Sequence, residues 1–457
     1  MTDTGIRSEN NGLFAVLRYP AFRYIWAGAL VSNVGNWMEA VAQSWLVQQQ
    51  TSSPFMVELL AASEFVPAAI LLLAAGALAD RYDRQKLLIF GQSVMMVFGA
   101  VLAAAAHFGW ASPWVVIAIA FAEGAAWATV TPSWQALVPA LVPREELPAA
   151  IALNSAQFNV ARLLGPMLAG VLLSAASAAV VFDFNVVSFL GIVIVLVIVR
   201  APRLHAPAKP VHAGGVKPAL RWALREKGPR RLIVGLVAFA LFAAPVQGLL
   251  PTMADTELHV GAHGYGLLLS SLGCGAVMGA LTLSRMPKTY PRHHLIPLSM
   301  LGFSLCALIY GASRWPLLSA VVLAVGGVFW VWSLASSSTA MQLLVPDELR
   351  GRAMSVLALA TTGPLPIGHL VGGLVAHGFG IRAGVLVSAS ALTVFAAWSV
   401  FAREPGIDAH LPRLLPAPPR GLRATLWETL SGASHRAQEI EPGNPPGSAE
   451  PLEADAS

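Results

Sequence analysis

Residues 70–86 read Ile70-Leu-Leu-Leu-Ala-Ala-Gly-Ala-Leu-Ala-Asp-Arg-Tyr-Asp-Arg-Gln-Lys86. An uncharged block ends abruptly in a short charged segment, and another apolar run begins at Leu87. Apolar blocks of about 20 residues joined by short charged loops are typical of membrane-spanning helices. Helices are favoured over strands because the bilayer core offers no water to satisfy backbone N–H and C=O groups. This stretch therefore predicts an all-α membrane protein.

The composition of the whole chain agrees with a membrane protein. Of the 457 residues, 56% are hydrophobic and 12% are charged, whereas a soluble domain carries about 25% charged residues. The formal charge of +5 does not point to a nucleic-acid partner, because basic residues flank membrane helices on one side. Cys274 and Cys306 lie in apolar stretches and show no disulfide or metal-binding pattern. Met1–Gly12 lacks the features of a cleavable signal peptide.

The alternation of apolar blocks and turn signals predicts twelve spans. They are 22–47, 54–79, 87–108, 113–138, 148–174, 178–200, 231–252, 263–284, 294–312, 316–341, 354–376 and 382–403. Ser53-Pro54, Pro143-Arg144 and Pro346-Asp347 mark three of the breaks. Residues 254–262 are expected to form a polar external loop.

The distribution of Lys and Arg predicts the orientation. Of 29 such residues, only Arg314 and Arg382 fall in loops after odd-numbered spans, and Arg162 lies inside the fifth span. The remaining 26 (29 − 2 − 1) fall at the N-terminus, after even-numbered spans or in the C-terminal tail. Because basic loops stay in the cytoplasm, both termini are expected there, in a multi-pass protein of the cell (inner) membrane.

Two similar halves are indicated by matches at an offset of 203 residues. The predicted organisation is a cytoplasmic N-terminus (1–21), a six-helix half (22–200), a cytoplasmic linker (201–230), a second half (231–403) and a disordered cytoplasmic tail (404–457). The matching pairs are Gly76 with Gly279, Gly124 with Gly327, Trp127 with Trp330, Pro143 with Pro346, Gly165 with Gly368, and Gly170 with Gly373. Within the linker, 219–227 reads either as an interfacial helix or as a solvated segment that sets topology.

The segment after the second span holds a candidate gate formed by Gly76, Asp80, Arg81 and Arg84. A glycine lets another helix approach closely, and Asp80 could accept hydrogen bonds or pair with Arg84. The alternative is a basic loop that only fixes topology. The segment resembles the signature loop of the major facilitator superfamily, where Gly, Asp-Arg and a basic pair recur at this spacing. That resemblance covers roughly 15–403 and implies a transporter whose site lies between the halves.

Other segments narrow the resemblance to one branch of that superfamily. They are Arg18-Tyr-Pro-Ala-Phe-Arg23, Val34-Gly-Asn-Trp37, Trp45-Leu-Val47, Thr51-Ser-Ser-Pro54, Leu141-Val-Pro-Arg144 and Asn159-Val-Ala-Arg-Leu-Leu-Gly-Pro166. These segments look like those of enterobactin exporters and macrolide efflux proteins. The resemblance implies export, and the residues alone do not.

The fifth span combines a buried charge with a pliant motif. Gly165, Pro166 and Gly170 resemble part of the motif of drug/proton antiporters, and the alternative is a packing kink. Arg162 falls near mid-membrane, where an arginine costs about 2.5–3.5 kcal/mol on insertion scales. It is expected to face the cavity and to need an acidic or carbonyl partner, as a substrate ligand, a coupling residue or a structural ion pair.

Carboxyl groups inside apolar spans are candidates for carrying a proton. Glu39 and Glu123 come first, because the resemblance implies that the first and fourth helices line the cavity, and Arg162 is expected to pair with either. Glu64 reads more simply as a polar contact near the outer face. Glu58 and Asp183 are expected at the outer interface and at the headgroups, respectively.

Aromatic and polar side chains in the spans suggest a large amphipathic cavity. The candidates are Trp37, Trp127, Gln135, Trp330 and Ser337. Serine and threonine inside spans often only join helices, which is the competing interpretation. His369 is a weaker proton candidate, since most such histidines are structural.

The sequence predicts a secondary active exporter of a small amphipathic or anionic molecule, siderophore- or drug-like, working by proton antiport with alternating access. A proton arriving on Glu39 or Glu123 displaces a cationic substrate or weakens its contacts. A proton-coupled importer, and a receptor on a transporter scaffold, remain as alternatives. No nucleotide-binding or hydrolase motif is present, so no enzyme activity, catalytic residue, cofactor or metal is expected. The expected partners are the substrate, the proton and the lipid bilayer, and the chain is expected to be a monomer.

Overall fold

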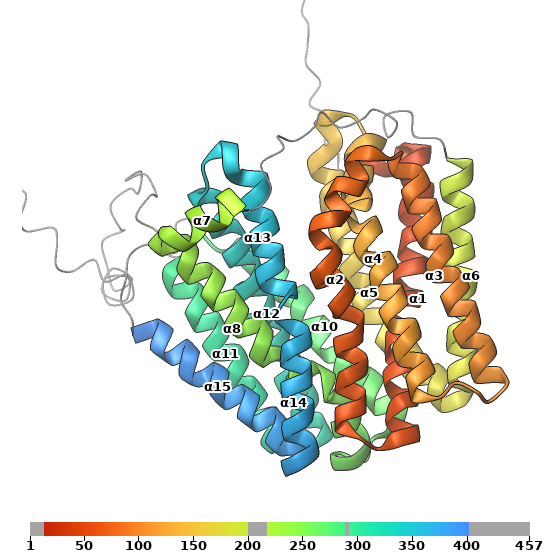
Figure 1. Cartoon of the computed structure of the whole chain (residues 1–457), viewed down its shortest axis with the longest axis vertical. Coiled ribbons are helices and arrows are strands. Elements are labelled where there is room, and N and C mark those ends of the chain that lie inside the picture. The colour runs from red at the N-terminus through yellow and green to blue at the C-terminus, as the bar shows by residue number, and fades with distance from the viewer. Residues whose placement is uncertain (1–12, 200–216, 288–291, 402–457) are drawn as a thin grey trace, which may run out of the picture. The chain divides into compact units, whose positions relative to one another are not determined.

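The computed structural model describes residues 13–199, 217–287 and 292–401, which fold into helices joined by short connections (Figure 1). The first half comprises α1 (Pro20–Thr51), α2 (Pro54–Arg81), α3 (Arg84–His107), α4 (Pro113–Leu141), α5 (Leu147–Ala175) and α6 (Ala178–Ile198). The second half comprises α8 (Lys227–Gly248), α10 (Gly261–Arg285), α11 (Arg292–Ala312), α12 (Pro316–Leu344), α13 (Arg350–Thr362) with α14 (Leu365–Phe379), and α15 (Ile381–Phe401). Shorter elements are η1 (Leu13–Arg18), η2 (Arg144–Glu146), α7 (Lys217–Arg225), α9 (Leu250–Thr252), η4 (Met253–Glu257) and η5 (Asp347–Leu349).

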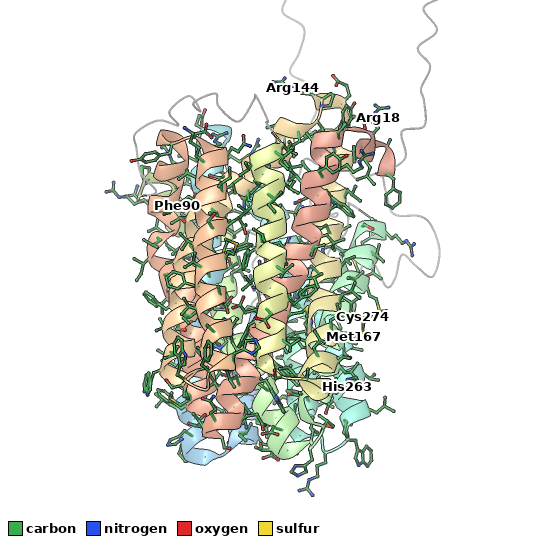
Figure 2. All side chains as sticks on the ribbon, turned by 90° about the vertical axis from the view of Figure 1, so that its right-hand side faces the viewer. Arg18, Phe90, Arg144, Met167, His263 and Cys274 are labelled. Atoms are coloured by element: carbon green, nitrogen blue, oxygen red, sulfur yellow. The ribbon has the colours of Figure 1, made fainter. Side chains whose placement is uncertain are left out.

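Within the described residues, eleven helical segments are long and apolar enough to cross a membrane. The helix α1 is 32 residues long but falls outside this group, because its polar side chains lower its hydropathy. It packs against α5 and α6 inside the first half and so completes a twelve-helix arrangement. Large apolar side chains such as Phe90, which is 69% exposed, cover the outside of the bundle (Figure 2). Such a surface suits lipid rather than water.

One expectation about helix ends is wrong, and one predicted span contains a turn. The seventh span continues past 252 through α9 and the π-turn η4, so 254–257 are helical rather than part of a loop. The extension is stable because its acids have partners: Gln48 Nε2 donates to Asp255 Oδ2 over 3.0 Å, and Arg382 Nε donates to Glu257 Oε2 over 2.6 Å. The eleventh span is divided at Gly363-Pro364 into α13 and α14, where proline removes a backbone donor.

The linker contributes one described helix. Lys217–Arg225 forms α7, which packs against α8 and α13. Its Ala219 and Ala223 are fully buried, while Leu220 and Leu224 are exposed. Residues 219–225 are therefore helical, rather than an unstructured part of the linker.

The two halves repeat the same helix contacts. Gly124 of α4 contacts the backbone carbonyl of Glu64 in α2, and Gly327 of α12 contacts that of Leu272 in α10. Gly165 of α5 likewise packs on α1, and the equivalent Gly368 of α14 packs on α8. These glycines occupy matching positions because each allows two helices to touch backbone to backbone. The bundle is therefore pseudo-symmetric.

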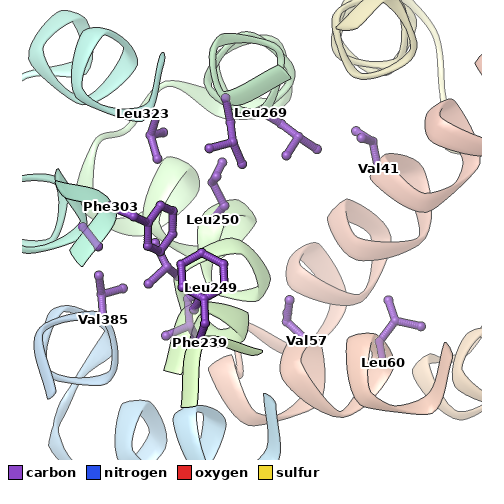
Figure 3. Close-up of a cluster of buried hydrophobic side chains, with 14 of the residues drawn as sticks. Val41, Val57, Leu60, Phe239, Leu249, Leu250, Leu269, Phe303, Leu323 and Val385 are labelled. Atoms are coloured by element: carbon purple, nitrogen blue, oxygen red, sulfur yellow. The ribbon is translucent and has the colours of Figure 1, made fainter. Parts of the chain in front are cut away.

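The described contacts between the halves gather at one end of the bundle. We call this end, which carries Thr51–Pro54, the Ser53 end, and the other, which carries Arg81–Arg84, the Arg84 end. At the Ser53 end α2 packs on α14 and α5 packs on α10. Apolar side chains from both halves form one buried cluster there, in which Val57 and Leu60 of α2 lie with Leu249 and Leu269 (Figure 3).

Candidate functional site

Two buried carboxyl groups of the first half share a bridging amide. Gln43 Nε2 donates to Glu39 Oε1 over 3.2 Å and to Glu123 Oε2 over 3.1 Å. Glu39 is 4% exposed and Gln43 is 6% exposed. Two carboxylates in so dry a place repel each other when both are charged, and a shared proton relieves that repulsion. The arrangement brings together two of the three residues that the sequence singles out for proton coupling.

The sixth helix fixes the orientation of Glu39. Asn185 of α6 is fully buried and donates from its side-chain nitrogen to Glu39 Oε2. Ser188 Oγ in turn donates to Asn185 Oδ1 over 3.0 Å. The absence of a side chain at Gly35 leaves room for Asn185 and Ser188 beside α1. Both oxygens of Glu39 therefore accept hydrogen bonds, whereas Oε1 of Glu123 is buried and has no hydrogen-bond partner among the described residues.

A cavity of about 350 Å³ lies among the helices of the first half. Its described lining comes from α1, α3, α4, α5 and α6 and includes Asn36, Trp127, Gln135, Asn154 and Phe158. Trp127 and Gln135 were expected at such a cavity from the sequence. At that volume it can hold a small ligand.

The carboxyl cluster lies about one helical turn from the cavity. On α1, Glu39 follows the lining residue Asn36 by three positions, and on α4, Glu123 precedes the lining residue Trp127 by four positions. Residues three or four apart share a helix face and are separated by roughly 5–6 Å along the axis. A change of charge in the cluster is therefore placed to act on the cavity through two helices.

Arg162 does not pair with Glu39 or Glu123, contrary to the sequence expectation. Its guanidinium carbon lies 5.8 Å from the ring centroid of Trp37, and its side chain makes no ion pair or hydrogen bond within the described residues. Glu39 is unavailable because it is held by Asn185 and Gln43. A planar guanidinium over an indole is a favourable cation–π pair.

Three further cavity candidates lie elsewhere. Trp37 packs edge-on against Phe158, with ring centroids 6.3 Å apart, and so stands behind the lining. Trp330 packs against Phe239 and Phe303, at 5.2 and 5.4 Å. Ser337 is fully buried with an unpartnered hydroxyl. The described residues around the cavity belong to the first half, so Trp330 and Ser337 do not join it.

The fifth-helix motif forms a backbone-to-backbone contact between the halves. A Cβ at Gly170 would lie 3.0 Å from the carbonyl oxygen of Ala262 and 3.2 Å from the Cα of Gly266, both in α10. A Cβ at Gly266 would collide with the carbonyl oxygen of Pro166. Gly165 faces α1 instead, against Trp37. The motif therefore joins α5 both to its own half and to the other.

Glu58 is placed differently from the sequence expectation, whereas His369 has the buried polar partner expected of a structural histidine. Glu58 is fully buried rather than at an interface with water, and its Oε2 shares a hydrogen bond with Nδ1 of His369 in α14. The ring of Phe65 stacks on His369 with centroids 6.1 Å apart. Asp183, by contrast, is half exposed and lies 2.8 Å from Nε2 of His107.

The candidate gate is only partly described. Gly76, Asp80 and Arg81 lie in the last turns of α2, and their side chains lie outside the described residues, so a latch there stays a prediction. The residue with a visible structural role is Asp83, whose Oδ1 accepts from the backbone N–H groups of Gln85 and Lys86 over 2.9 and 3.2 Å. It caps α3, and the partially buried Arg84 begins that helix.

Sequence reasoning missed most of the polar lining. Asn33 and Asn36 on α1, and Asn154, Gln157 and Asn159 on α5, all face the cavity. The three-residue spacing of Asn33 and Asn36, and of Asn154 and Gln157, within apolar spans was the available signal. Within the described residues no group of three His, Cys, Asp or Glu side chains is placed to hold a metal ion.

Comparison with known proteins gives the wider context. The chain is similar to the staphyloferrin A transporter of Staphylococcus aureus (22% identity over 79% of this chain and 90% of that protein). It is also similar to macrolide efflux protein A of Streptococcus pyogenes, with 23% identity over 82% of this chain and 94% of that protein. The enterobactin exporter EntS of Citrobacter koseri matches with 27% identity over 78% of this chain and 85% of that protein.

Solved structures share the fold at low sequence identity. A bacterial homologue of the lysosomal transporter Spinster, inward-facing and unoccupied, matches with a TM-score of 0.65 at 13% identity, over 85% of this chain and 98% of that one. The nucleoside transporter NupG matches with a TM-score of 0.67 at 12% identity, over 84% of this chain and 100% of that one.

The model of a transmembrane secretion effector family matches residues 11–426 of the chain. The chain therefore belongs to the transmembrane secretion effector family of the major facilitator superfamily and is a membrane transport protein rather than an enzyme.

Proposed function

We propose that this protein exports a small amphipathic molecule by proton antiport, with the Arg84 end in the cytoplasm. The observation that carries the proposal is the Glu39–Gln43–Glu123 cluster, one helical turn from a cavity of about 350 Å³. The three relatives named above, a siderophore transporter, a drug efflux protein and a siderophore exporter, support this direction and this class of cargo.

Proton binding is coupled to substrate binding through the charge of the Glu39–Gln43–Glu123 cluster. When a proton enters the cluster, Gln43 no longer bridges two anions, and the hydrogen bonds that orient α1 against α4 change. The cavity lining on the same two helices shifts with them, so the affinity for substrate differs between the two protonation states. A ligand and a proton that bias one equilibrium in opposite directions are exchanged rather than carried together.

Alternating access uses the contacts between the halves. The structure is closed at the Ser53 end by α2 on α14 and by α5 on α10. We infer that export requires these contacts to part while the Arg84 end closes, with Asp80, Arg81 and Arg84 as the candidate latch there.

The test is transport into everted membrane vesicles. A panel of labelled amphipathic compounds, including a siderophore and a macrolide, is offered with and without a pH gradient. At least one compound should accumulate only with the gradient. In Glu39→Gln vesicles that accumulation should be lost while substrate–substrate exchange persists, and the exposed control Glu145→Gln should behave as wild type. Accumulation that survives collapse of the gradient would refute proton antiport.

The competing importer makes the opposite prediction. In right-side-out vesicles, where the outside is the acidic side, an importer would accumulate the compound. In everted vesicles, where the inside is the acidic side, it would not. Running both vesicle types with the same compound decides the direction.

A further inference from the structure

The described lining of the cavity is rich in carboxamides and holds no charged side chain. Besides Asn159, it contains Asn33, Asn36, Gln92, Gln135, Asn154 and Gln157. Two charged residues of the neighbouring helix segments are engaged elsewhere, because Glu39 is 4% exposed within its own cluster and Arg162 lies over Trp37. A ligand in this cavity therefore meets dipoles and not ions.

Most of these amides are not used by the fold. Asn159 donates to the backbone carbonyl of Ser155 over 2.8 Å, but the other six make no hydrogen bond within the described part of the chain. Gln92 and Gln157 are 5% and 2% exposed, and each keeps a buried polar atom that has no hydrogen-bond partner among the residues that the structure describes. Buried polar groups in native proteins are almost always hydrogen-bonded, so these two amides lack a partner that a ligand or water supplies.

The hydrogen-bonding groups of a carboxamide limit which ligand groups can be that partner. Each amide offers donors on nitrogen and an acceptor on oxygen. A carboxylate only accepts and an ammonium only donates, so either one leaves half of each amide unsatisfied. A hydroxyl group donates and accepts, and several hydroxyl groups can serve several amides at once.

Aromatic rings provide the second half of the recognition. Trp127 is 40% exposed and Phe158 is 41% exposed, and both line the cavity together with Trp134. Their flat faces suit apolar rings and the C–H faces of saturated rings. A lone ion would also enter at high cost, because no counter-charge lines the described wall.

We propose that this cavity binds an uncharged amphipathic molecule with several hydroxyl groups, of the kind in which a polyhydroxylated ring carries an apolar ring system. The inference rests on the proposed export function for its biological setting but not for its binding chemistry. It selects the neutral amphipathic class over the anionic class that the sequence alone also allows.

The test uses three matched probes with the full-length protein in lipid nanodiscs. They are methylumbelliferyl glucoside, its glucuronide and its amino-deoxy analogue, which carry a hydroxymethyl, a carboxylate and an ammonium group at the same ring carbon. Equilibrium dialysis should show the glucoside binding at least about tenfold more tightly than either charged probe. Equal or tighter binding of a charged probe overturns the proposal, and so does failure of all three to bind.

Two variants tie the binding to this cavity. Gln157→Leu and Gln92→Leu each remove a buried amide without a full set of partners, so folding should be preserved, and each should weaken glucoside binding about five- to tenfold. The matched control is Gln342→Leu, an exposed glutamine of α12 in the other half, which should leave binding unchanged. Unchanged binding in both cavity variants places the ligand elsewhere and overturns the proposal.

The same probes in proteoliposomes separate this inference from the export function. If a charged probe is transported and the glucoside neither binds nor moves, export stands and the inference falls. If the glucoside binds as expected but no substrate of the vesicle panel or probe is ever moved, the inference stands and export falls.

Discussion

The side chains of Glu58 and His369, 311 positions apart in the sequence, share a buried hydrogen bond between α2 of one half and α14 of the other. Both are enclosed, with side-chain exposures of 0% and 6%. Removing one member of such a pair leaves the other buried without its hydrogen-bond partner, which costs about 1–3 kcal/mol. The pair therefore stabilises the contact between α2 and α14 at the Ser53 end.

We expect Glu58→Leu to open the Ser53 end. The reason is that His369 then loses its only described polar partner. Spin labels at the exposed positions Ser52 and Phe379, in a background without Cys274 and Cys306, should report a longer distance population. The double variant Glu58→Leu/His369→Leu should recover part of the closed population, because no buried polar group is left unpaired. Additive effects of the two substitutions would argue against a coupled pair.

Gln43→Leu is expected to reduce proton coupling more than it reduces substrate binding. The substitution removes the amide that bridges Glu39 and Glu123 and leaves both carboxyl groups in place. The ratio of protons to substrate moved, obtained from reversal of the flux at set gradients, should fall below that of wild type. An unchanged ratio would show that the two carboxyl groups act independently.

Gly266→Val should prevent closure of the Ser53 end and abolish transport. The added side chain would collide with the carbonyl oxygen of Pro166 and crowd Gly170, so α5 and α10 cannot approach. Gly191→Val is the control, because nothing lies within 4 Å of a Cβ at that position. Transport at a wild-type rate by Gly266→Val would mean that the contact is not needed.

Arg162→Lys should destabilise the protein although it preserves the charge. An ammonium group cannot stack its plane on Trp37 as the guanidinium does, and the loss is expected to be about 0.5–2 kcal/mol. Thermal unfolding of the nanodisc-embedded protein measures it. In a Trp37→Leu background the same substitution should have a smaller effect, and an equal effect would exclude the cation–π pair as the cause.

Membrane-impermeant labelling tests the orientation. Single cysteines at Glu145, in η2, and at Ser177, between α5 and α6, occupy exposed positions at opposite ends of the bundle. From the positive-inside bias we expect Ser177 to react in intact cells and Glu145 only in everted vesicles. Arg18 and Arg144 lie at the same end as Glu145 (Figure 2). Reaction of both cysteines from one side would contradict the helix count as well as the orientation.

The sequence predicts well the features that the surrounding membrane determines, above all the positions of the spans. Hydropathy placed the spans within a few residues, and the glycine matches at a fixed offset anticipated equivalent helix contacts in both halves. Polar residues at a helix end were misread, because Asp255 and Glu257 look like a loop until Gln48 and Arg382 are seen beside them.

Pairings between distant residues could not be predicted in the same way. Glu39 and Glu123 were each recognised as buried acids, but Gln43 and Asn185, which hold them, look like ordinary polar residues in a helix. Arg162 was assigned an acidic partner on energetic grounds, and the structure supplies an aromatic ring instead. The amides of the cavity are spread over four helices, so no local pattern collects them.

The turn at Gly363-Pro364 divides the eleventh span into two helical segments, α13 and α14. Both segments contact α2 of the first half and α8 of the second half, and α13 also contacts the linker helix α7. The segment α13 thus joins α7 to the contact between α2 and the second half. A displacement of α7 would therefore reach, through α13, the helices on both sides of the contact between the halves.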